Sequence, residues 1–425
     1  MSRIIQVHER LSFWRSLPLG LQHLFAMFGS TVLVPILFKV DPATILLMNG
    51  IGTLLYIFIT KGKIPAYLGS SFAFLSPVFA VLAGKGGYQA ALGGFLAVGI
   101  IFMIVALLIR YVGTGWIDVV FPPASMGAIV AVIGLELVPT AARMAGFIAP
   151  DGAPAGWSPD PTAVTVAVVT SLVGVLGSVL FRGILKVIPI LIAIVIGYVL
   201  SGLLGIVHVA EAVGAAGWLT VPTFYTPVLD WPSIAIIAPA ALVVIAEHIG
   251  HLIVTGNIVG KDLSQDPGLG RSLLGNGVST VISAAVGSTP NTTYGENIGV
   301  MAISRVYSVW VIGMAAVMAI VLSFVGKLSA LIQTIPTPVM GGVSLLLFGV
   351  IAASGLRMLV ETKVDYSKPA NLILTTVVLV VGLSGAVFRW GHLELKGMAL
   401  ATVIAIVLSL TFKLFEVMKW SNEAD

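Results

Sequence analysis

The chain has 425 residues, of which 58% are apolar and only 9% are charged. Apolar runs recur from Leu17 to Phe415, which is typical of an integral membrane protein and not of a large soluble domain. The formal net charge of +4 is scattered without a polybasic segment, so nucleic acid is not expected as a partner. The lack of cysteine excludes disulfides and thiol chemistry.

The apolar runs predict the membrane spans. A charged segment, residues 1–16, precedes a run that is too long for a signal peptide and lacks an Ala-x-Ala cleavage site, so we expect a retained first span. Runs of spanning length, about 20 residues, lie near 17–38, 43–60, 89–110, 122–142, 162–181, 187–207, 232–256, 305–326, 339–356, 369–388 and 396–415. Shorter or interrupted runs lie at 66–82, 272–287 and 294–304. Together they predict an all-α polytopic protein with about fourteen transmembrane segments.

Basic residues orient these spans. With fourteen spans and the N-terminus inside, sixteen of the 22 Lys and Arg residues fall on the inner side. Cytoplasmic loops hold the excess of Lys and Arg in membrane proteins. The sequence therefore predicts that both termini, residues 1–16 and 416–425, are cytoplasmic.

The two halves of the chain share short motifs in the same order. Residues 122–127 reappear as 336–341, residues 69–71 as 287–289, and Gln22-His23 as Glu247-His248, at offsets of 214, 218 and 225 residues. The alternative is chance similarity among segments rich in Gly and Pro. A repeat of seven spans forces the halves into opposite orientations, which is the inverted-repeat plan of secondary transporters.

Two segments at membrane depth contain helix-breaking residues. Residues 287–305 include Pro290 and Gly295, and residues 65–77 form their counterpart in the first half. Irregular backbone within a membrane is tolerated only where it is buried in protein or lines a cavity. The half-helix after each break would point free N–H groups at the membrane centre, where they could bind a solute that carries carbonyl groups. A kinked packing helix is the alternative for either segment alone.

Three acidic residues fall within predicted spans. Glu247 and His251 lie one helical turn apart, on the same face. A buried carboxylate is costly when charged, and a neighbouring imidazole can share or relay its proton. This pair therefore indicates proton coupling, the alternatives being a structural carboxyl group and a packing imidazole. Glu136 lies toward the outer end of its span, so we expect its side chain to reach the interface.

Glu296 follows Tyr294 and Gly295 at the start of the second half-helix. A carboxylate there is favoured by the helix dipole and offers a strong acceptor to a ligand N–H. Phe72, after the first break, could stack on a flat ring, although most aromatic residues in membrane cores serve packing.

Other classes of site find little support. The chain has no Gly-x-x-x-x-Gly-Lys-Ser/Thr loop, which argues against ATP-driven transport. Glu247-His248-x-x-His251 is not a zinc motif, and no further carboxylate follows at helical spacing. We expect no metal, no cofactor and no enzymatic activity.

Four motifs carry a family resemblance over essentially the whole chain. They are residues 21–29 (LQHLFAMFG), 69–74 (GSSFAF), 245–251 (IAEHIGH) and 291–299 (NTTYGENIG). The chain resembles bacterial uracil permeases of the nucleobase/ascorbate transporter family. The last motif runs into a family signature that begins Glu296-Asn297-Ile298-Gly299 and ends Ser304-Arg305, where Ser304 replaces the usual Thr. That change keeps the hydroxyl group and affects packing more than class.

The resemblance implies roles that spacing alone does not give. Glu247 and Glu296 would accept the ring N–H groups of uracil, and the backbone N–H groups of Phe72 and Gly295 would donate to its carbonyl groups. His251 would sit beside Glu247 in the proton path. Ser71, Tyr294 and Asn297 would support the site. Purine-transporting relatives usually carry Gln at the position of Glu296.

The resemblance also implies an architecture and a mode of transport. Residues 17–121 (spans 1–4) and 231–327 (spans 8–11) would form a core domain, and residues 122–210 (spans 5–7) and 335–415 (spans 12–14) a gate domain. The two interrupted segments would contribute short strands that meet in the core. The expected protein is a proton-coupled uracil importer of the bacterial inner membrane, and a homodimer through its gate domains. The alternatives are a proton symporter for a purine such as xanthine, and an anion exchanger or channel of the same fold.

Overall fold

The computed structural model describes residues 4–84, 86–150, 152–207, 209–391 and 393–420. The outermost parts of the two predicted cytoplasmic segments, residues 1–3 and 421–425, lie outside the described residues. In the described part, seven helical segments are long and apolar enough to cross a membrane: α3 (Pro42–Ile59), α5 (Gly87–Val112), α7 (Pro123–Met144), α8 (Pro161–Leu180), α11 with α12 (Trp231–Ile237, Ala240–Val259), α17 (Thr337–Glu361) and α19 (Gly397–Val417). An eighth span is the bent pair α1 (Phe13–Ala26) and α2 (Phe28–Phe38).

Six further elements, which are shorter or less apolar, complete the fourteen predicted segments. They are η1 with α4 (Phe72–Phe74, Leu75–Ala83), α9 (Pro189–Leu203), α13 (Leu269–Val286), α14 (Gly295–Ser304), α15 (Val309–Ser323) and α18 (Pro369–Leu383). The connecting elements are α6 (Ile117–Val120), η2 (Gly183–Val187), α10 (Val209–Ala215), η3 (Ser264–Gly268) and α16 (Gly326–Gln333). A hairpin of β3 (Val387–Trp390) and β4 (Leu393–Lys396) joins α18 to α19. The chain is thus a multi-pass helical membrane protein, as the sequence predicts.

Local sequence sets several helix starts. Asp41, Asp160 and Asp230 each stand immediately before a helix, and each side chain accepts a hydrogen bond from a backbone N–H in the first turn. A proline follows within the first two positions of each of these helices, where its missing N–H costs nothing. These signals fix the boundaries at which loops enter the membrane.

Two three-residue strands lie inside the helical bundle. Strand β1 (Leu68–Ser70) pairs with β2 (Asn291–Thr293) in antiparallel register, with Gly69 opposite Thr292. A threonine hydroxyl holds the first backbone N–H of each strand: Thr53 on α3 accepts from Leu68 at 2.9 Å, and Thr280 on α13 accepts from Asn291 at 3.2 Å. Buried backbone at membrane depth is satisfied in this way without a helix.

These equivalent contacts correct one part of the repeat alignment. Strand β2 lies 223 residues after β1, so residues 68–70 correspond to 291–293. The predicted match of residues 69–71 with 287–289 is wrong, because Gly287 is instead the left-handed cap that ends α13. Helix packing follows the inverted repeat: α5 with α13 mirrors α15 with α3, α8 with α17 mirrors α18 with α7, and α8 with α9 mirrors α18 with α19.

The crossing of α7 and α17 depends on residues without side chains. A Cβ atom on Gly134 would lie 2.3 Å from the carbonyl oxygen of Phe348, and one on Gly355 would lie 2.4 Å from the backbone nitrogen of Ala131. Small residues at helix contacts let two backbones approach closely within a membrane. The helices α7 and α17 are equivalent in the two repeats, and they pack directly against each other.

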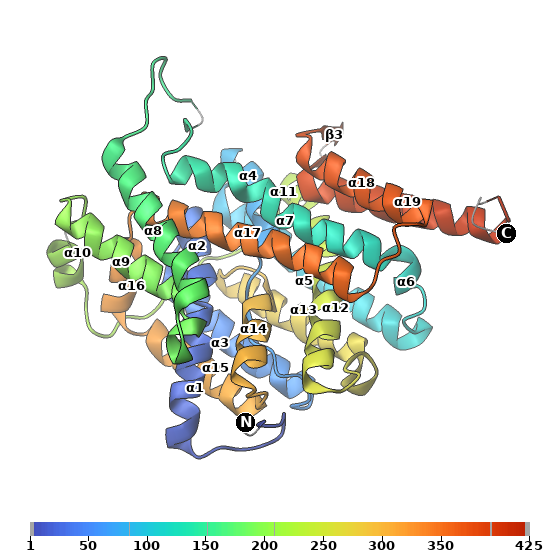
Figure 1. Ribbon diagram of the computed structural model, residues 1–425, viewed down its shortest axis with the longest axis horizontal. Helices are drawn as coiled ribbons and strands as arrows, with labels where there is room; N and C mark the ends of the chain where they lie inside the picture. The colour runs from blue at the N-terminus through green and yellow to red at the C-terminus, as the bar shows by residue number, and fades with distance from the viewer. Residues whose placement is uncertain (1–3, 85, 151, 208, 392, 421–425) are drawn as a thin grey trace.

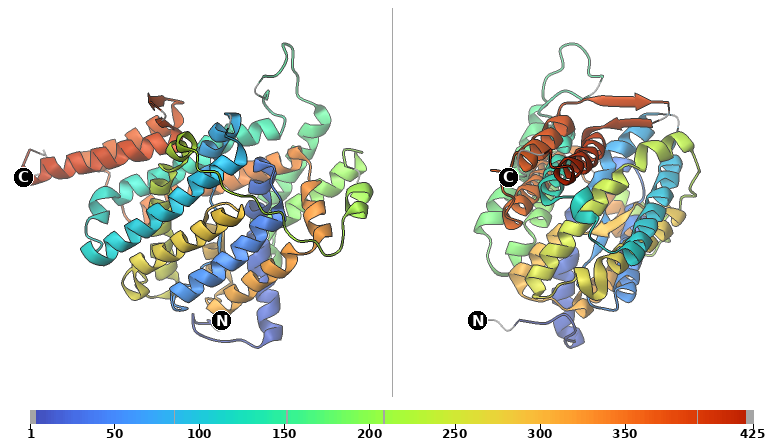
Figure 2. Two further views of the ribbon diagram at one scale, coloured as in Figure 1. Left: turned by 180° about the vertical axis from the view of Figure 1, so that it is seen from behind. Right: turned by 90° about the vertical axis from the view of Figure 1, so that its right-hand side faces the viewer.

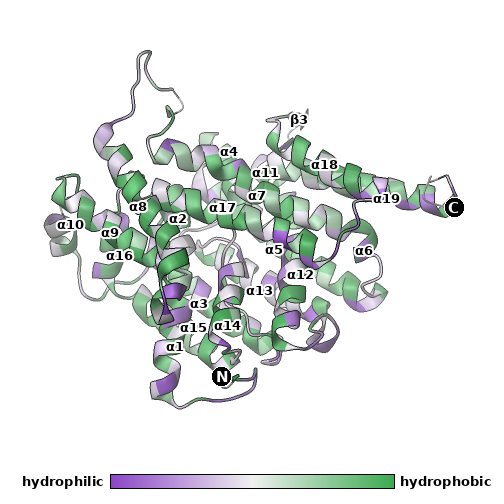
Figure 3. Ribbon diagram, viewed as in Figure 1, coloured by the Kyte–Doolittle hydropathy of each residue, from purple (hydrophilic) through white to green (hydrophobic). Residues whose placement is uncertain are grey.

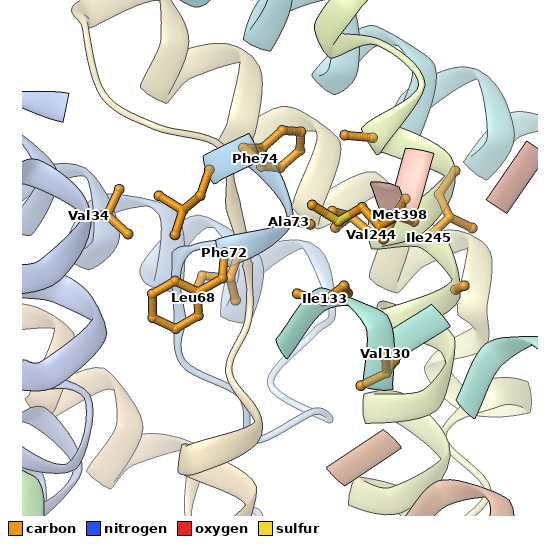
Figure 4. Packing of buried hydrophobic residues seen from close by; sticks show 14 of the residues in the cluster. Val34, Leu68, Phe72, Ala73, Phe74, Val130, Ile133, Val244, Ile245 and Met398 are labelled. Atoms are coloured by element: carbon orange, nitrogen blue, oxygen red, sulfur yellow. The ribbon is translucent and has the colours of Figure 1, made fainter. Parts of the chain in front are cut away.

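The helices form two groups in space. In Figure 1, α7, α17, α18 and α19 run side by side across the upper part, while α1, α3, α13, α14 and α15 lie below them. The left view of Figure 2, which is seen from behind, shows α3, α5 and α13 packed alongside one another. Figure 3 shows that the helices are mostly hydrophobic and that hydrophilic residues gather at helix ends and loops. Figure 4 shows the first break, Phe72 to Phe74, packed near residues of α7 and α12, including Ile133 and Val244.

Candidate functional site

A cavity of about 260 Å³ lies where the two interrupted segments meet. Seven of the predicted site residues line it: Ser71, Phe72, Glu247, His251, Tyr294, Gly295 and Glu296. The opposite wall comes from α7 and α17 and is largely apolar, with Val130, Val350 and Ile351. The cavity therefore lies between the two helix groups.

The ends of two short helices face this cavity. Phe72 is the first residue of η1 and Gly295 is the first residue of α14, so neither N–H has a carbonyl one turn earlier in its own helix. The Ser71 hydroxyl accepts a hydrogen bond from the Ala73 N–H at 3.3 Å and caps the first of these ends. The antiparallel strands place the two helix starts across from each other. The arrangement offers backbone donors from two directions.

Two carboxyl groups share the cavity with these donors. Glu247 extends from α12, and the Ser71 hydroxyl donates to its Oε2 at 3.5 Å. Glu296 lies in the first turn of α14. Charges on the two groups would repel each other. A ligand with two N–H groups would find an acceptor on each side.

His251 lies one turn after Glu247 and also faces the cavity. Its Nδ1 is 3.2 Å from the Thr293 hydroxyl. Its Nε2 is so close to the second helix start that a Cβ atom on Gly295 would lie only 3.1 Å away. The missing side chain of Gly295 thus leaves room for the imidazole beside the backbone donor.

The side chains of Phe72 and Asn297 mainly contact other residues of the protein. The ring of Phe72 is 7% exposed and packs edge-on against Phe348 of α17, with 5.6 Å between the ring centres. Asn297 does not line the cavity; its Nδ2 donates to Nδ1 of His23 on α1 at 2.8 Å. Asn297 therefore joins α14 to α1, which suits a supporting position behind the site.

Comparison with known proteins agrees with this architecture. Residues 15–390 match the sequence model of a permease family. The uracil permease of Paenibacillus larvae is 70% identical over 99% of both chains, and that of Escherichia coli K12 is 62% identical over 98% of this chain and 96% of the relative. The chain belongs to the permease family. The family resemblance carried by the sequence motifs is thereby confirmed, and it marks the protein as a transporter rather than an enzyme.

Solved structures show how this permease folds. The transmembrane domain of the cyanobacterial bicarbonate transporter BicA superimposes with a TM-score of 0.60 at 15% identity, covering 97% of this chain and 99% of that chain. The murine solute carrier 26 family member A9 gives a TM-score of 0.69 at 12% identity, covering 96% and 70% of the two chains. These likenesses confirm the predicted fold of seven plus seven inverted spans with two interrupted helices.

The permease has cavity residues that sequence reasoning missed. Ser354, Arg357 and Glu361, near the C-terminal end of α17, also line the cavity. Arg357 Nε and Glu361 Oε1 form an ion pair at 2.6 Å. No local motif distinguishes them from the ordinary charged end of a span. Their role becomes visible only because α17 crosses α7 opposite the interrupted segments.

One sequence expectation about a side chain is wrong. Glu136 does not extend to the interface; it is half-buried, and its Oε2 accepts a hydrogen bond from the Met398 N–H at 2.9 Å. Gly397, which precedes Met398, has a φ of 51° and approaches the same carboxyl group. Glu136 therefore caps the start of α19. Among the described residues, no group of three or more His, Asp or Glu side chains could hold a metal ion.

Proposed function

We propose that this permease is a proton-coupled secondary transporter that imports uracil across the bacterial inner membrane by alternating access. The observation that carries the proposal is one cavity in which Glu247 and Glu296 accompany two helix starts with free N–H groups. Uracil presents two ring N–H groups and two carbonyl groups. The two carboxyl acceptors can pair with the two ring N–H groups, and the two backbone donors can pair with the two carbonyl groups.

Four of the predicted site residues have a proposed role in binding the ring. Glu247 and Glu296 accept the ring N–H groups, while the backbone N–H groups of Phe72 and Gly295 donate to the carbonyl groups. Phe72 contributes an apolar wall. The family resemblance and the names of the relatives, uracil permeases, support this substrate.

Proton coupling would come from Glu247 and His251. Both face the cavity, and Glu247 shares it with a second carboxyl group. An empty site holding two charged carboxylates is unfavourable, so uptake of a proton and of the ring N–H donors should favour each other. No other cofactor is part of the proposal.

Movement of two domains would give alternating access. We propose that residues 17–121 and 231–327 form the core and that residues 122–210 and 335–415 form the gate, with the cavity between them. The cavity extends to residues near the ends of α12, α14 and α17, such as Ile258, Ala302 and Glu361. With both termini in the cytoplasm, those ends are cytoplasmic, and the conformation described here is inward-facing. A homodimer joined through the gate domains completes the proposal.

Two other functions remain as alternatives with distinct outcomes. A purine symporter of the xanthine type would use the same cavity for a larger ring. An anion exchanger or channel is suggested by the fold of BicA and solute carrier 26 member A9. Two carboxyl groups in the cavity disfavour a bound anion.

Counterflow of labelled uracil into vesicles containing the purified protein tests the substrate. Vesicles loaded with unlabelled uracil should accumulate label, and external uracil should compete far better than xanthine or bicarbonate. If labelled xanthine or bicarbonate accumulated in vesicles loaded with the same unlabelled compound, while labelled uracil did not accumulate in uracil-loaded vesicles, the protein would be a purine symporter or an anion exchanger, respectively.

A further inference from the structure

A second, fully buried layer of polar side chains lies directly behind the cavity. His248 on α12 is 1% exposed and points away from the cavity. Its Nε2 is 2.8 Å from the Ser272 hydroxyl, which is 2.6 Å from the Tyr56 hydroxyl. Its Nδ1 is 3.1 Å from Nδ2 of Asn276. The proposed transport cycle assigns none of these groups a role.

The partners of His248 fix which nitrogen carries its hydrogen. In the structure the Asn276 amide turns its NH2 group toward Nδ1 of His248 and leaves its own Oδ1 without a hydrogen-bond partner. In this orientation the amide can only donate, so Nδ1 of His248 accepts. A neutral imidazole that accepts at Nδ1 carries its hydrogen on Nε2, and this hydrogen is donated to Ser272. His248 therefore presents a permanent acceptor on its Nδ1 side.

The Thr293 hydroxyl links the tautomer of His248 to that of His251 in the cavity. Its hydroxyl oxygen lies 3.3 Å from Nδ1 of His248 and 3.2 Å from Nδ1 of His251. Nδ1 of His248 has no hydrogen to give, and its single lone pair already accepts from Asn276. The Thr293 hydroxyl therefore donates to the same lone pair as the longer branch of a shared hydrogen bond. The same oxygen can then only accept from His251, which must carry its hydrogen on Nδ1.

We infer that Thr293 and His248 are positioning residues that hold His251 in the Nδ1–H tautomer, so that its cavity-facing Nε2 is the atom that takes up a proton. Nε2 is the nitrogen beside Gly295. A proton added there leaves the bond from Nδ1 to Thr293 intact. The imidazole can thus gain and lose its proton at the cavity without rotating its ring.

The surroundings of His251 define what the tautomer controls. The ionisable side chains that share its cavity are Glu247 on the same helix, Tyr294 and Glu296 at the start of α14, and Arg357 and Glu361 on α17. Tyr56 lies behind His248. With Nε2 as an acceptor, His251 can exchange a proton with the cavity or with Glu247. This inference rests on the proposed proton coupling.

The tautomer can be measured directly in the full-length protein. Nitrogen-15 histidine spectra in lipid nanodiscs, assigned with His251→Gln, should show His251 in the Nδ1–H form. Thr293→Val keeps the branched shape and removes the hydroxyl, so it should shift His251 toward the Nε2–H form, and Thr293→Ser should restore the Nδ1–H form. Thr402→Val, the same change at a buried threonine of α19 that does not line the cavity, should have no effect.

Transport measurements complete the test. Thr293→Val should lower the maximal rate of proton-driven uracil uptake about 10-fold while KM changes less than about 3-fold, because a positioned proton acceptor acts on turnover. Thr293→Ser should recover most of the rate. A wild-type His251 in the Nε2–H form, or a Thr293→Val protein with unchanged tautomer and rate, would overturn the inference. If wild-type uptake ignores the proton gradient, the proposed function fails, while the spectra still decide the tautomer.

Discussion

The two interrupted segments share a backbone design but differ in chemistry. Each has a three-residue strand followed by a short helix that starts at the cavity, and each strand is held by a threonine hydroxyl of a neighbouring helix. The first segment brings Ser71 and Phe72 to the cavity, whereas the second brings Gly295 and Glu296. The repeat thus builds a symmetric frame, and its second half carries the ionisable group.

The same asymmetry appears in the helices beside these segments. Gln22-His23 on α1 corresponds to Glu247-His248 on α12. His23 bonds to Asn297, while His248 bonds to Ser272 and Asn276 and approaches Thr293. Only the second half has a carboxyl group followed by a cavity-facing imidazole, Glu247 and His251. The two halves therefore share their backbone geometry, and the second half carries the ionisable groups of the proposed proton and substrate chemistry.

The largest expected effect follows from neutralising the carboxyl group of that half on α12. Glu247→Gln should reduce proton-driven uracil uptake about 100-fold or more, because it removes both a ligand acceptor and a proton site. Uptake in proteoliposomes measures the change, and size-exclusion profiles check folding. Glu136→Gln, the same substitution outside the cavity, is the control and should transport. Equal loss in both variants would mean that the defect is not specific to the site.

Glu296→Gln should weaken uracil binding about 10-fold to 100-fold, because a charged acceptor is replaced by a neutral amide that also presents donors. The amide donors should improve recognition of purines such as xanthine relative to uracil. Isothermal calorimetry with both ligands measures the ratio. Unchanged uracil affinity would remove Glu296 from ring recognition and leave Glu247 and His251 as the chemical difference between the two halves.

A smaller effect is expected when a side chain is added at the second helix start. Gly295→Ala places a methyl group about 3.1 Å from Nε2 of His251. The imidazole must shift, so uptake should fall about 3-fold to 10-fold through loss of alignment. Gly202→Ala on α9 is the matched control, since Gly202 does not line the cavity and a Cβ atom there meets nothing within 4 Å. If both variants transport equally, the space at Gly295 has no functional importance.

The smallest effect concerns stability. Glu136→Gln should lower the free energy of unfolding by about 1 kcal/mol, because the cap on α19 loses its charge but keeps an oxygen acceptor. The melting temperature should drop by about 1 °C, with uracil affinity unchanged. An unchanged melting temperature together with altered affinity would show that Glu136 acts on the site.

Sequence patterns were sufficient for the frame of this molecule. Apolar runs give the spans, and the helix-breaking residues near Pro290 locate a break because membrane backbone must be hydrogen-bonded. Helical spacing also places Glu247 and His251 on one face and turns His248 away, as the structure shows. These features depend on local geometry, which a sequence encodes directly.

Features that depend on contacts between distant segments could not be predicted in the same way. The capping role of Glu136 can be predicted only if Gly397 and Met398 are known to lie against α7. The presence of Arg357 and Glu361 in the cavity can be predicted only if the crossing of α17 and α7 is known. The strand register also escaped the motif match, since β1 and β2 share no residue type that could align them.

Coupling of uracil to protons in one cavity is the property on which the proposed transport depends. Uptake of labelled uracil into vesicles should be measured with and without an inward proton gradient, for the wild type and Glu247→Gln in parallel. The gradient should accelerate wild-type uptake, a protonophore should abolish that gain, and the variant should show no response. Wild-type uptake at the same rate with and without the gradient would contradict the account.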